Sequence, residues 1–159
     1  LRSYSLYADM LSDFYKKEMG EEWIEIRQEA MKILRREAEL QEMVRLVGID
    51  ALSPKDRLIM ETARSIREDF LQQNAFMDAD TYTSLKKQYR MMKLIHLFNK
   101  LAAHALDKNV GLDKILSLPI RIEISRAKLI PEKELKKFDA IEEKISSLFN
   151  TLVKEVENG

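Results

Sequence analysis

Hydrophobic residues recur at steps of three and four along most of the chain, which is the spacing of amphipathic α-helices. The clearest stripe runs from Trp23 to Val47 and is followed by Gly48, a typical helix stop. Its apolar members, interrupted by Glu37, are Trp23, Ile26, Ala30, Ile33, Leu40, Val44 and Val47. The pattern predicts one long helix that packs into a bundle through this stripe.

A turn and a new helix start follow Gly48. In Asp50-Ala-Leu-Ser-Pro-Lys-Asp56, Ser53 can cap the next helix and Pro54 suits its first position. Asp56 lies three residues beyond the cap, as in a capping box. The helix that starts here is expected to bury Ile59, Ala63, Ile66 and Phe70. We therefore predict two long antiparallel helices joined by a short turn.

The helical periodicity fails at residues 72–84, and such a long irregular stretch inside a compact domain is often functional. Further helices are predicted at residues 9–19, 84–108, 111–118 and 131–156. Residues 121–125 alternate like a strand, but one strand has no partner here, so an extended or helical linker is expected. The predicted fold is all-α, a bundle of about five helices with one long functional loop.

Composition limits what such a bundle can do. The 27 basic and 27 acidic residues balance, whereas a nucleic-acid-binding protein normally shows a basic excess. Cysteine is absent, which excludes disulfides and thiolate metal sites. No apolar run approaches the roughly 20 residues that span a bilayer. We expect a soluble helical domain with no nucleic-acid partner and no direct membrane insertion.

Sites for chemistry are largely missing from the sequence. It has no phosphate-binding glycine motif, and His96 and His104 lie too far apart along one predicted helix to share a metal readily. Asp78 and Asp80 resemble the start of a calcium loop, but the central glycine and the final glutamate of that motif are missing. We predict no catalytic residue and no metal site. The pairs Lys86-Lys87 and Lys136-Lys137 are interpreted as solvated faces.

Phe70 and Phe76 flank the start of the irregular stretch, and two interpretations remain open. Both can be core aromatics, one at the end of a helix and one holding a loop. Aromatic faces at a loop can also receive a planar ring such as a nucleobase. Periodicity does not distinguish the two.

A family resemblance adds to this picture. Arg67-Glu-Asp-Phe-Leu-Gln-Gln-Asn-Ala-Phe76 and the following Asp80-Thr-Tyr82 resemble the C-terminal part of the catalytic A subunits of archaeal A-type and vacuolar-type rotary ATP synthases. Ser3-Tyr-Ser-Leu-Tyr7 and Ala38-Glu-Leu-Gln41 also fit. The resemblance runs from Leu1 to about Ile130 and fades in the final helix. Thr83 stands where relatives commonly have Cys, and Met77 where they often have a polar residue.

The resemblance implies one C-terminal helical domain over residues 1–159. Residues 1–20 would lead in from a nucleotide-binding domain, residues 21–130 would form the family-like bundle, and residues 131–159 would form a terminal amphipathic helix. ATP or ADP and magnesium would bind to the missing core, so this piece is expected to be inactive by itself. The implied partners are its own nucleotide-binding domain, the non-catalytic B subunit and the central-stalk subunits. The implied location is cytoplasmic, in a membrane-bound complex that translocates protons or other ions.

The same resemblance implies two contact sites. The related beta subunit of F-type synthases touches the rotating axle through an acidic turn, and residues 50–56 look like its counterpart. Asp50, Leu52, Ser53 and Asp56 are retained, whereas Ala51, Pro54 and Lys55 depart from that turn. In the beta subunit, aromatic residues also flank the adenine; Phe76 falls at one such position, and Phe70 is a candidate for another.

Two other functions fit a helical bundle of this kind. One is a standalone scaffold that docks a partner helix. The other is a nucleotide-sensing regulatory domain, which would need phosphate-binding groups that the sequence lacks.

Overall fold

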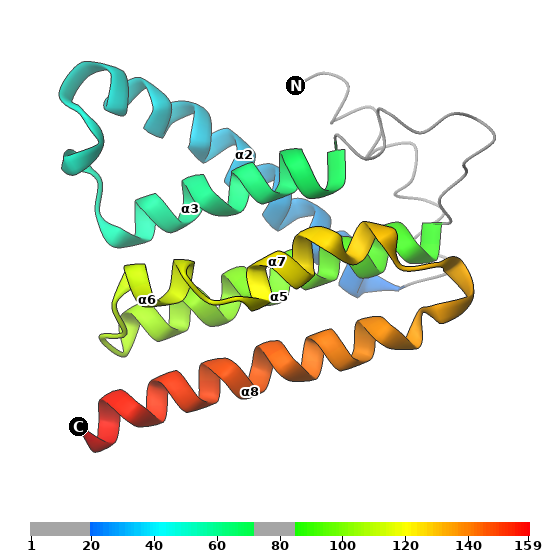
Figure 1. Cartoon of the computed structure of the whole chain (residues 1–159). Helices are drawn as coiled ribbons and strands as arrows, with labels where there is room; N and C mark the ends of the chain where they lie inside the picture. The colour runs from blue at the N-terminus through cyan, green and yellow to red at the C-terminus, as the bar shows by residue number, and fades with distance from the viewer. Residues whose placement is uncertain (1–19, 72–84) are drawn as a thin grey trace.

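A computed structural model describes residues 20–71 and 85–159, and over these residues it contains six α-helices and no strand. Helices α2 (Glu21–Val47) and α3 (Pro54–Ser65) form an antiparallel hairpin, joined by the short 3-10 turn η1 (Ile49–Ala51). Helix α3 then continues without a break into a π-helical turn, η2 (Ile66–Leu71). The all-α prediction is confirmed (Figure 1).

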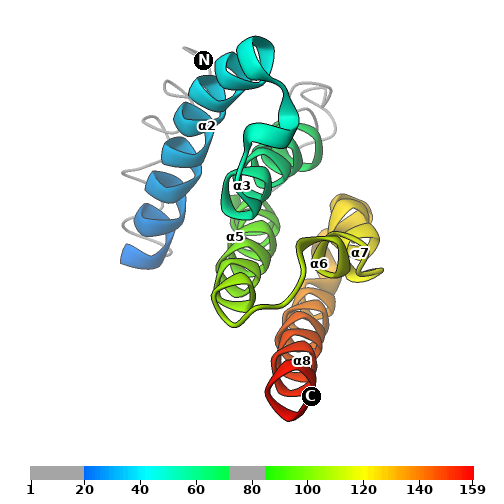
Figure 2. The ribbon, with the colours of Figure 1, turned by 90° about the vertical axis from the view of Figure 1, so that its left-hand side faces the viewer.

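The second half of the molecule consists of α5 (Leu85–Asp107), α6 (Leu112–Leu116), α7 (Ile120–Arg126) and α8 (Lys136–Asn158). The 3-10 turns η3 (Ala127–Leu129) and η4 (Glu132–Glu134) connect α7 to α8. Helix α3 packs against both α2 and α5, and α5 packs against α8. The α2–α3 turn and α8 therefore lie at opposite edges of the molecule (Figures 1 and 2).

Local signals account for the bounds of the hairpin. Gly48 has φ of 90°, a conformation that disfavours any side chain, and its amide donates to the Val44 carbonyl at 2.9 Å. The Ser53 hydroxyl accepts a hydrogen bond from the Asp56 amide at 3.1 Å, and Pro54 is the first helical residue. The predicted stop and restart are both confirmed. The segment at residues 121–125, left open as extended or helical, lies in α7 and is helical.

The core confirms most of the predicted stripe. Its members from Trp23 to Leu40 are buried, as are Ala63 and Ile66 on the second helix. Val44 and, on the second helix, Ile59 are only half-buried, and Val47 is 67% exposed. Helices α2 and α3 diverge toward their turn, so the last turn of α2 lies away from the core (Figure 1). The predicted burial of Val47 is therefore wrong.

Lys87 corrects a second prediction. It was expected on a solvated face, but it is buried, and its ammonium group donates to the Lys128 carbonyl at 2.6 Å. Burial lowers the pKa of Lys87, and the nearby Glu132 carboxylate opposes that shift. This bond ties the start of α5 to η3. Lys136 and Lys137 are exposed, as predicted.

The predicted helix at residues 9–19 and the predicted loop at residues 72–84 lie outside the described residues.

Candidate functional site

The end of the α2–α3 hairpin carries a group of large apolar side chains that face solvent. Met43, Leu46 and Val47 of α2 and Ile49 of η1 are 39%, 73%, 67% and 52% exposed. We refer to these four residues as the apolar tip. A group of neighbouring exposed apolar side chains is typical of a binding surface, whereas single ones are ordinary.

The turn implied to touch an axle, residues 50–56, divides into two parts. Asp50 and Ala51 are exposed and lie next to the apolar tip in sequence. Leu52 is only 6% exposed, so its side chain belongs to the interior of the domain. Leu52 is therefore not available to a partner, whereas Asp50 and Ala51 are.

The second part of the turn is attached to the domain behind it. Ser53 caps α3, and the Lys55 ammonium lies 2.5 Å from the Asp107 carboxylate at the end of α5. The Asp56 carboxylate faces the Arg36 guanidinium of α2 at 3.7 Å. Ser53, Pro54 and Lys55 also line a groove of about 400 Å³ against the α5–α6 connection. These contacts connect the second part of the turn to α2 and α5 at the surface, while the side chains of the apolar tip stay exposed.

Sequence reasoning missed the apolar tip. A signal was present, since Met43 and Leu46 are apolar residues three positions apart and outside the predicted stripe. Apolar residues on the polar side of a helix end indicate a surface that something else covers.

The opposite end of α3 carries the second candidate region, the π-helical turn η2. Such turns make up well under 1% of residues in globular proteins and occur frequently at functional sites. Phe70 lies within this turn, and Phe76 lies outside the described residues. The two candidate adenine-binding aromatics therefore belong to the turn itself and to the segment that directly follows it in sequence.

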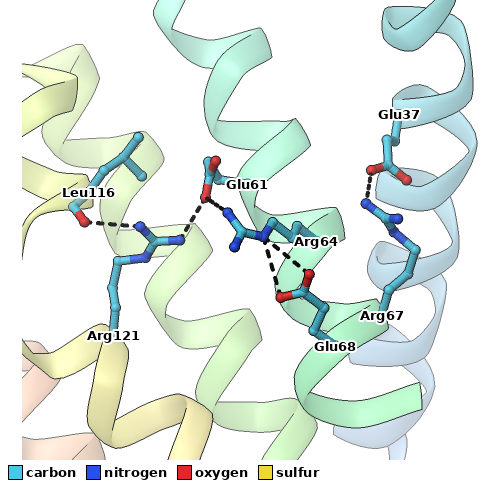
Figure 3. A network of polar contacts seen from close by, with 7 residues as sticks. All are labelled: Glu37, Glu61, Arg64, Arg67, Glu68, Leu116 and Arg121. Atoms are coloured by element: carbon cyan, nitrogen blue, oxygen red, sulfur yellow. Dashed lines mark hydrogen bonds and ion pairs between the residues drawn. The ribbon is translucent and has the colours of Figure 1, made fainter. Parts of the chain in front are cut away.

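An ion pair joins this turn to α2. The Arg67 guanidinium donates to Glu37 Oε2 at 2.5 Å, and the Glu37 side chain is only 9% exposed (Figure 3). Glu37 interrupts the apolar stripe of α2, and Arg67 is the group that compensates its buried charge. Burying a carboxylate without such a partner would be strongly unfavourable.

A ladder of ion pairs joins the same turn to the second half of the molecule. Arg64 donates to both carboxylate oxygens of Glu68 at 3.3 Å and lies 3.9 Å from Glu61. Glu61 also accepts from Arg121 at 2.8 Å, and Arg121 donates to the Leu116 carbonyl at the end of α6 (Figure 3). The π-helical turn is thus connected to α2 on one side and to α6 and α7 on the other.

A groove of about 490 Å³ lies beside this ladder, between η2 and the α6–α7 segment. Its two guanidinium groups, Arg64 and Arg121, are each paired with carboxylates, so the groove is not a ready anion site. Burial raises the pKa of Asp69 in the groove wall, with Lys128 and Arg121 opposing and Glu68 reinforcing the shift.

Neither a metal site nor a membrane span is found in the described residues. In residues 20–71 and 85–159, no group of three or more His, Asp or Glu side chains is placed to hold a metal ion. Within the same residues, no helix combines the length and the apolar character that crossing a membrane requires.

Comparison with known proteins identifies the family. A family model described as the C-terminal domain of V and A type ATP synthase matches residues 12–116. The chain belongs to this family. The matched residues include α2, α3, η2 and α5, so both the apolar tip and the π-helical turn lie inside the family domain.

Individual relatives agree with this assignment. The chain is 53% identical over 153 residues to a V-type ATP synthase alpha chain of Thermoanaerobacter pseudethanolicus and 50% identical to one of Clostridium tetani. It is 51% identical over 156 residues to the A subunit of the A-type ATP synthase of Methanopyrus kandleri. The alignments cover 96–98% of the chain and so extend into α8, beyond the end of the family model.

The relatives are longer than the chain and come from more than one domain of life. The chain spans only 26% of the length of these curated relatives. The relatives come from bacteria as well as archaea, so family membership does not assign the chain to the archaea.

Proposed function

We propose that this chain is the helical lever of the catalytic subunit of a rotary ATP synthase or ATPase. Its apolar tip presses on the central axle, and the opposite end of the hairpin adjoins the nucleotide. The observation that carries the proposal is the exposed apolar group next to a turn that an ion pair connects to α5 and a helix cap joins to α3. A stiff element that ends in an exposed apolar surface can pass displacement to a partner on which that surface packs.

The partners in this proposal are the nucleotide-binding domain and the B subunit on one side and the central-stalk subunits at the tip. ATP or ADP and magnesium are held by the nucleotide-binding domain, which supplies the chemistry. Phe76, and with it Phe70, contributes an aromatic wall to the adenine pocket. The 159-residue chain by itself has no magnesium-dependent ATPase activity in this proposal.

The proposal assigns the axle contact to apolar packing more than to charge. Asp50 is an exposed carboxylate of the turn, while Asp56 is partly exposed and lies 3.7 Å from the Arg36 guanidinium. Four apolar side chains precede or adjoin the exposed part of the turn in sequence. Burying one such side chain fully contributes about 1.5–3 kcal/mol.

The test introduces Leu46→Asp into the full-length protein of the assembled complex, with Asp50→Ala as the matched control. We expect Leu46→Asp to reduce the torque sustained in single-molecule rotation under viscous load, while Asp50→Ala leaves it nearly unchanged. The KM for ATP at low load is expected to stay the same in Asp50→Ala. A severe torque defect from Asp50→Ala alone would mean that electrostatics does the pushing.

A standalone scaffold that docks a partner helix would use the same tip. The test is made in the assembled complex because only there can rotation be measured. If the scaffold function is correct, Leu46→Asp abolishes binding of a partner and leaves rotation unaffected.

A further inference from the structure

The ion pair between the buried Glu37 and the partly exposed Arg67 is a feature that the proposed function does not yet use. Glu37 occupies a buried position in the apolar stripe of α2, where a carboxylate needs a partner. Its partner lies 30 residues further along the chain, on the π-helical turn. Ion pairs that are removed from water contribute little net stability. They can instead fix one arrangement of two elements, here α2 and η2.

The pair is well placed to fix such an arrangement. Helix α2 is one unbroken helix of 27 residues, with Glu37 inside it and Val47 at its end. At the rise of an α-helix, the ten-residue step between them amounts to about 15 Å. Because α2 is unbroken between Glu37 and Val47, a displacement of the apolar tip also moves Glu37.

Arg67, the partner of Glu37, lies where the backbone changes from α-helix to π-helix. It is the second residue of η2, in which the α-helical spacing of α3 gives way to a wider turn. Its Nε atom is buried without a hydrogen-bond partner in the described part of the chain, so the contact with Glu37 uses only one edge of the guanidinium group. A guanidinium group that is held only through this edge can follow Glu37 when α2 moves.

We infer that Glu37 and Arg67 are positioning residues that couple the apolar tip to the nucleotide end of the hairpin. The inference rests on the proposed function. When the axle displaces the tip, α2 carries Glu37 with it, and the ion pair reorients the π-helical turn. The turn leads directly into the segment that contains Phe76. The pair therefore sets how strongly the position of the axle changes the affinity for ATP.

The measurement is the ratio of the KM for ATP in complexes that contain the full-length protein and that are prepared with and without the axle. This ratio reports the coupling between the two ends, and residues that carry coupling change it by about 2- to 30-fold. We expect Glu37→Gln to move the ratio toward one by at least about threefold. A role in folding alone would lower the yield of complex and leave the ratio unchanged.

Matched variants separate the pair from a general effect on α2. Glu42→Gln makes the same chemical change on the same helix, at an exposed carboxylate paired with Arg45, and is expected to keep the wild-type ratio. Arg67→Lys keeps the charge but loses the planar fork, so an intermediate ratio is expected. The double variant Glu37→Gln/Arg67→Gln is expected to show no more loss than either single change, because the two residues act as a unit. If Glu37→Gln does not assemble, Arg67→Gln gives the same measurement at a side chain that is 39% exposed.

The outcomes also distinguish this inference from the proposed function. If Leu46→Asp brings the ratio to one but Glu37→Gln does not, the tip contacts the axle and the ion-pair inference is wrong. If the wild-type ratio is already one, both the proposed function and the inference are wrong. If both variants bring the ratio to one and Glu42→Gln does not, the inference is supported.

Discussion

Thr62 of α3 donates its hydroxyl hydrogen bond to the side-chain oxygen of Asn99 on α5, at 2.8 Å. Thr62 is almost fully buried, and the two residues are 37 positions apart in the sequence. This contact specifies how α3 is rotated against α5, because only one face of α3 presents the hydroxyl. It is a polar contact within the mostly apolar packing of α3 against α5.

Replacing Thr62 with valine keeps the shape of the side chain and removes the hydroxyl. We expect the free energy of unfolding to fall by about 1–2 kcal/mol, since Asn99 loses its partner in a partly buried place. Urea unfolding followed by circular dichroism measures the change. The control is Thr151→Val on α8, where an exposed hydroxyl donates to the Ser147 carbonyl within its own helix. Equal losses in the two variants would show that the Thr62 contact has no special role.

The start of α3 offers a second test of stability. Ser53→Ala removes the acceptor of the Asp56 amide and is expected to cost about 1 kcal/mol, whereas Ser53→Gly is expected to cost only a few tenths. Thermal or urea unfolding of both variants gives the comparison. If Ser53→Ala unfolds with the same free energy as the unchanged protein, the bond at Ser53 does not stabilise the helix start.

In the parent protein, Phe76→Ala is expected to raise the KM for ATP more than it lowers kcat. Aromatic contacts contribute about 0.5–1.5 kcal/mol beyond the burial of area, and the adenine is remote from the transferring phosphate. Steady-state hydrolysis by the assembled enzyme supplies both constants. An unchanged KM in a well-folded variant would return Phe76 to the role of a core aromatic.

His96 is expected to make stability depend on pH. Burial lowers its pKa from the ordinary value of 6.5, and Lys100 acts in the same direction. The α2 carboxylates Glu29, Glu25 and Glu22 oppose the shift. The unfolded histidine therefore takes up a proton at a higher pH than the folded one. The free energy of unfolding is expected to fall as the pH drops through about 6.5, until the folded histidine also takes up a proton.

Unfolding experiments between about pH 8 and pH 5.5 test this dependence. His96→Gln is expected to flatten the decline. The comparison variant is His104→Gln, which removes the other histidine of the chain and leaves His96 in place. If His104→Gln flattens the decline and His96→Gln does not, burial of His96 is not its cause.

Local signals allowed the sequence to predict much of the hairpin. The stop at Gly48, the cap at Ser53 and the proline at position 54 depend only on residues within one turn of each other. The apolar stripe from Trp23 to Leu40 follows from helical spacing alone. For these features, the physical cause lies inside the segment that shows it, so no knowledge of neighbouring helices is needed.

The candidate site depends on contacts that no local pattern contains. Periodicity marked Glu37 as an interruption, and only the packing of α3 on α2 brings Arg67 to it. The burial of Lys87 likewise depends on η3, which lies about forty residues further along the chain. A helical pattern states which residues share a face, but not what lies opposite that face.

The tertiary structure also decided which parts of the turn are available. The family resemblance implied that residues 50–56 form one contact surface. In the structure, Leu52 is buried and Lys55 pairs with Asp107. The same divergence of α2 from α3 leaves Val47 outside the core and completes the apolar tip. The sequence by itself determined the helices and their caps, because short-range forces set them. Burial and exposure at the ends of those helices were decided by where each helix leaves its neighbour, which is a property of the assembled fold.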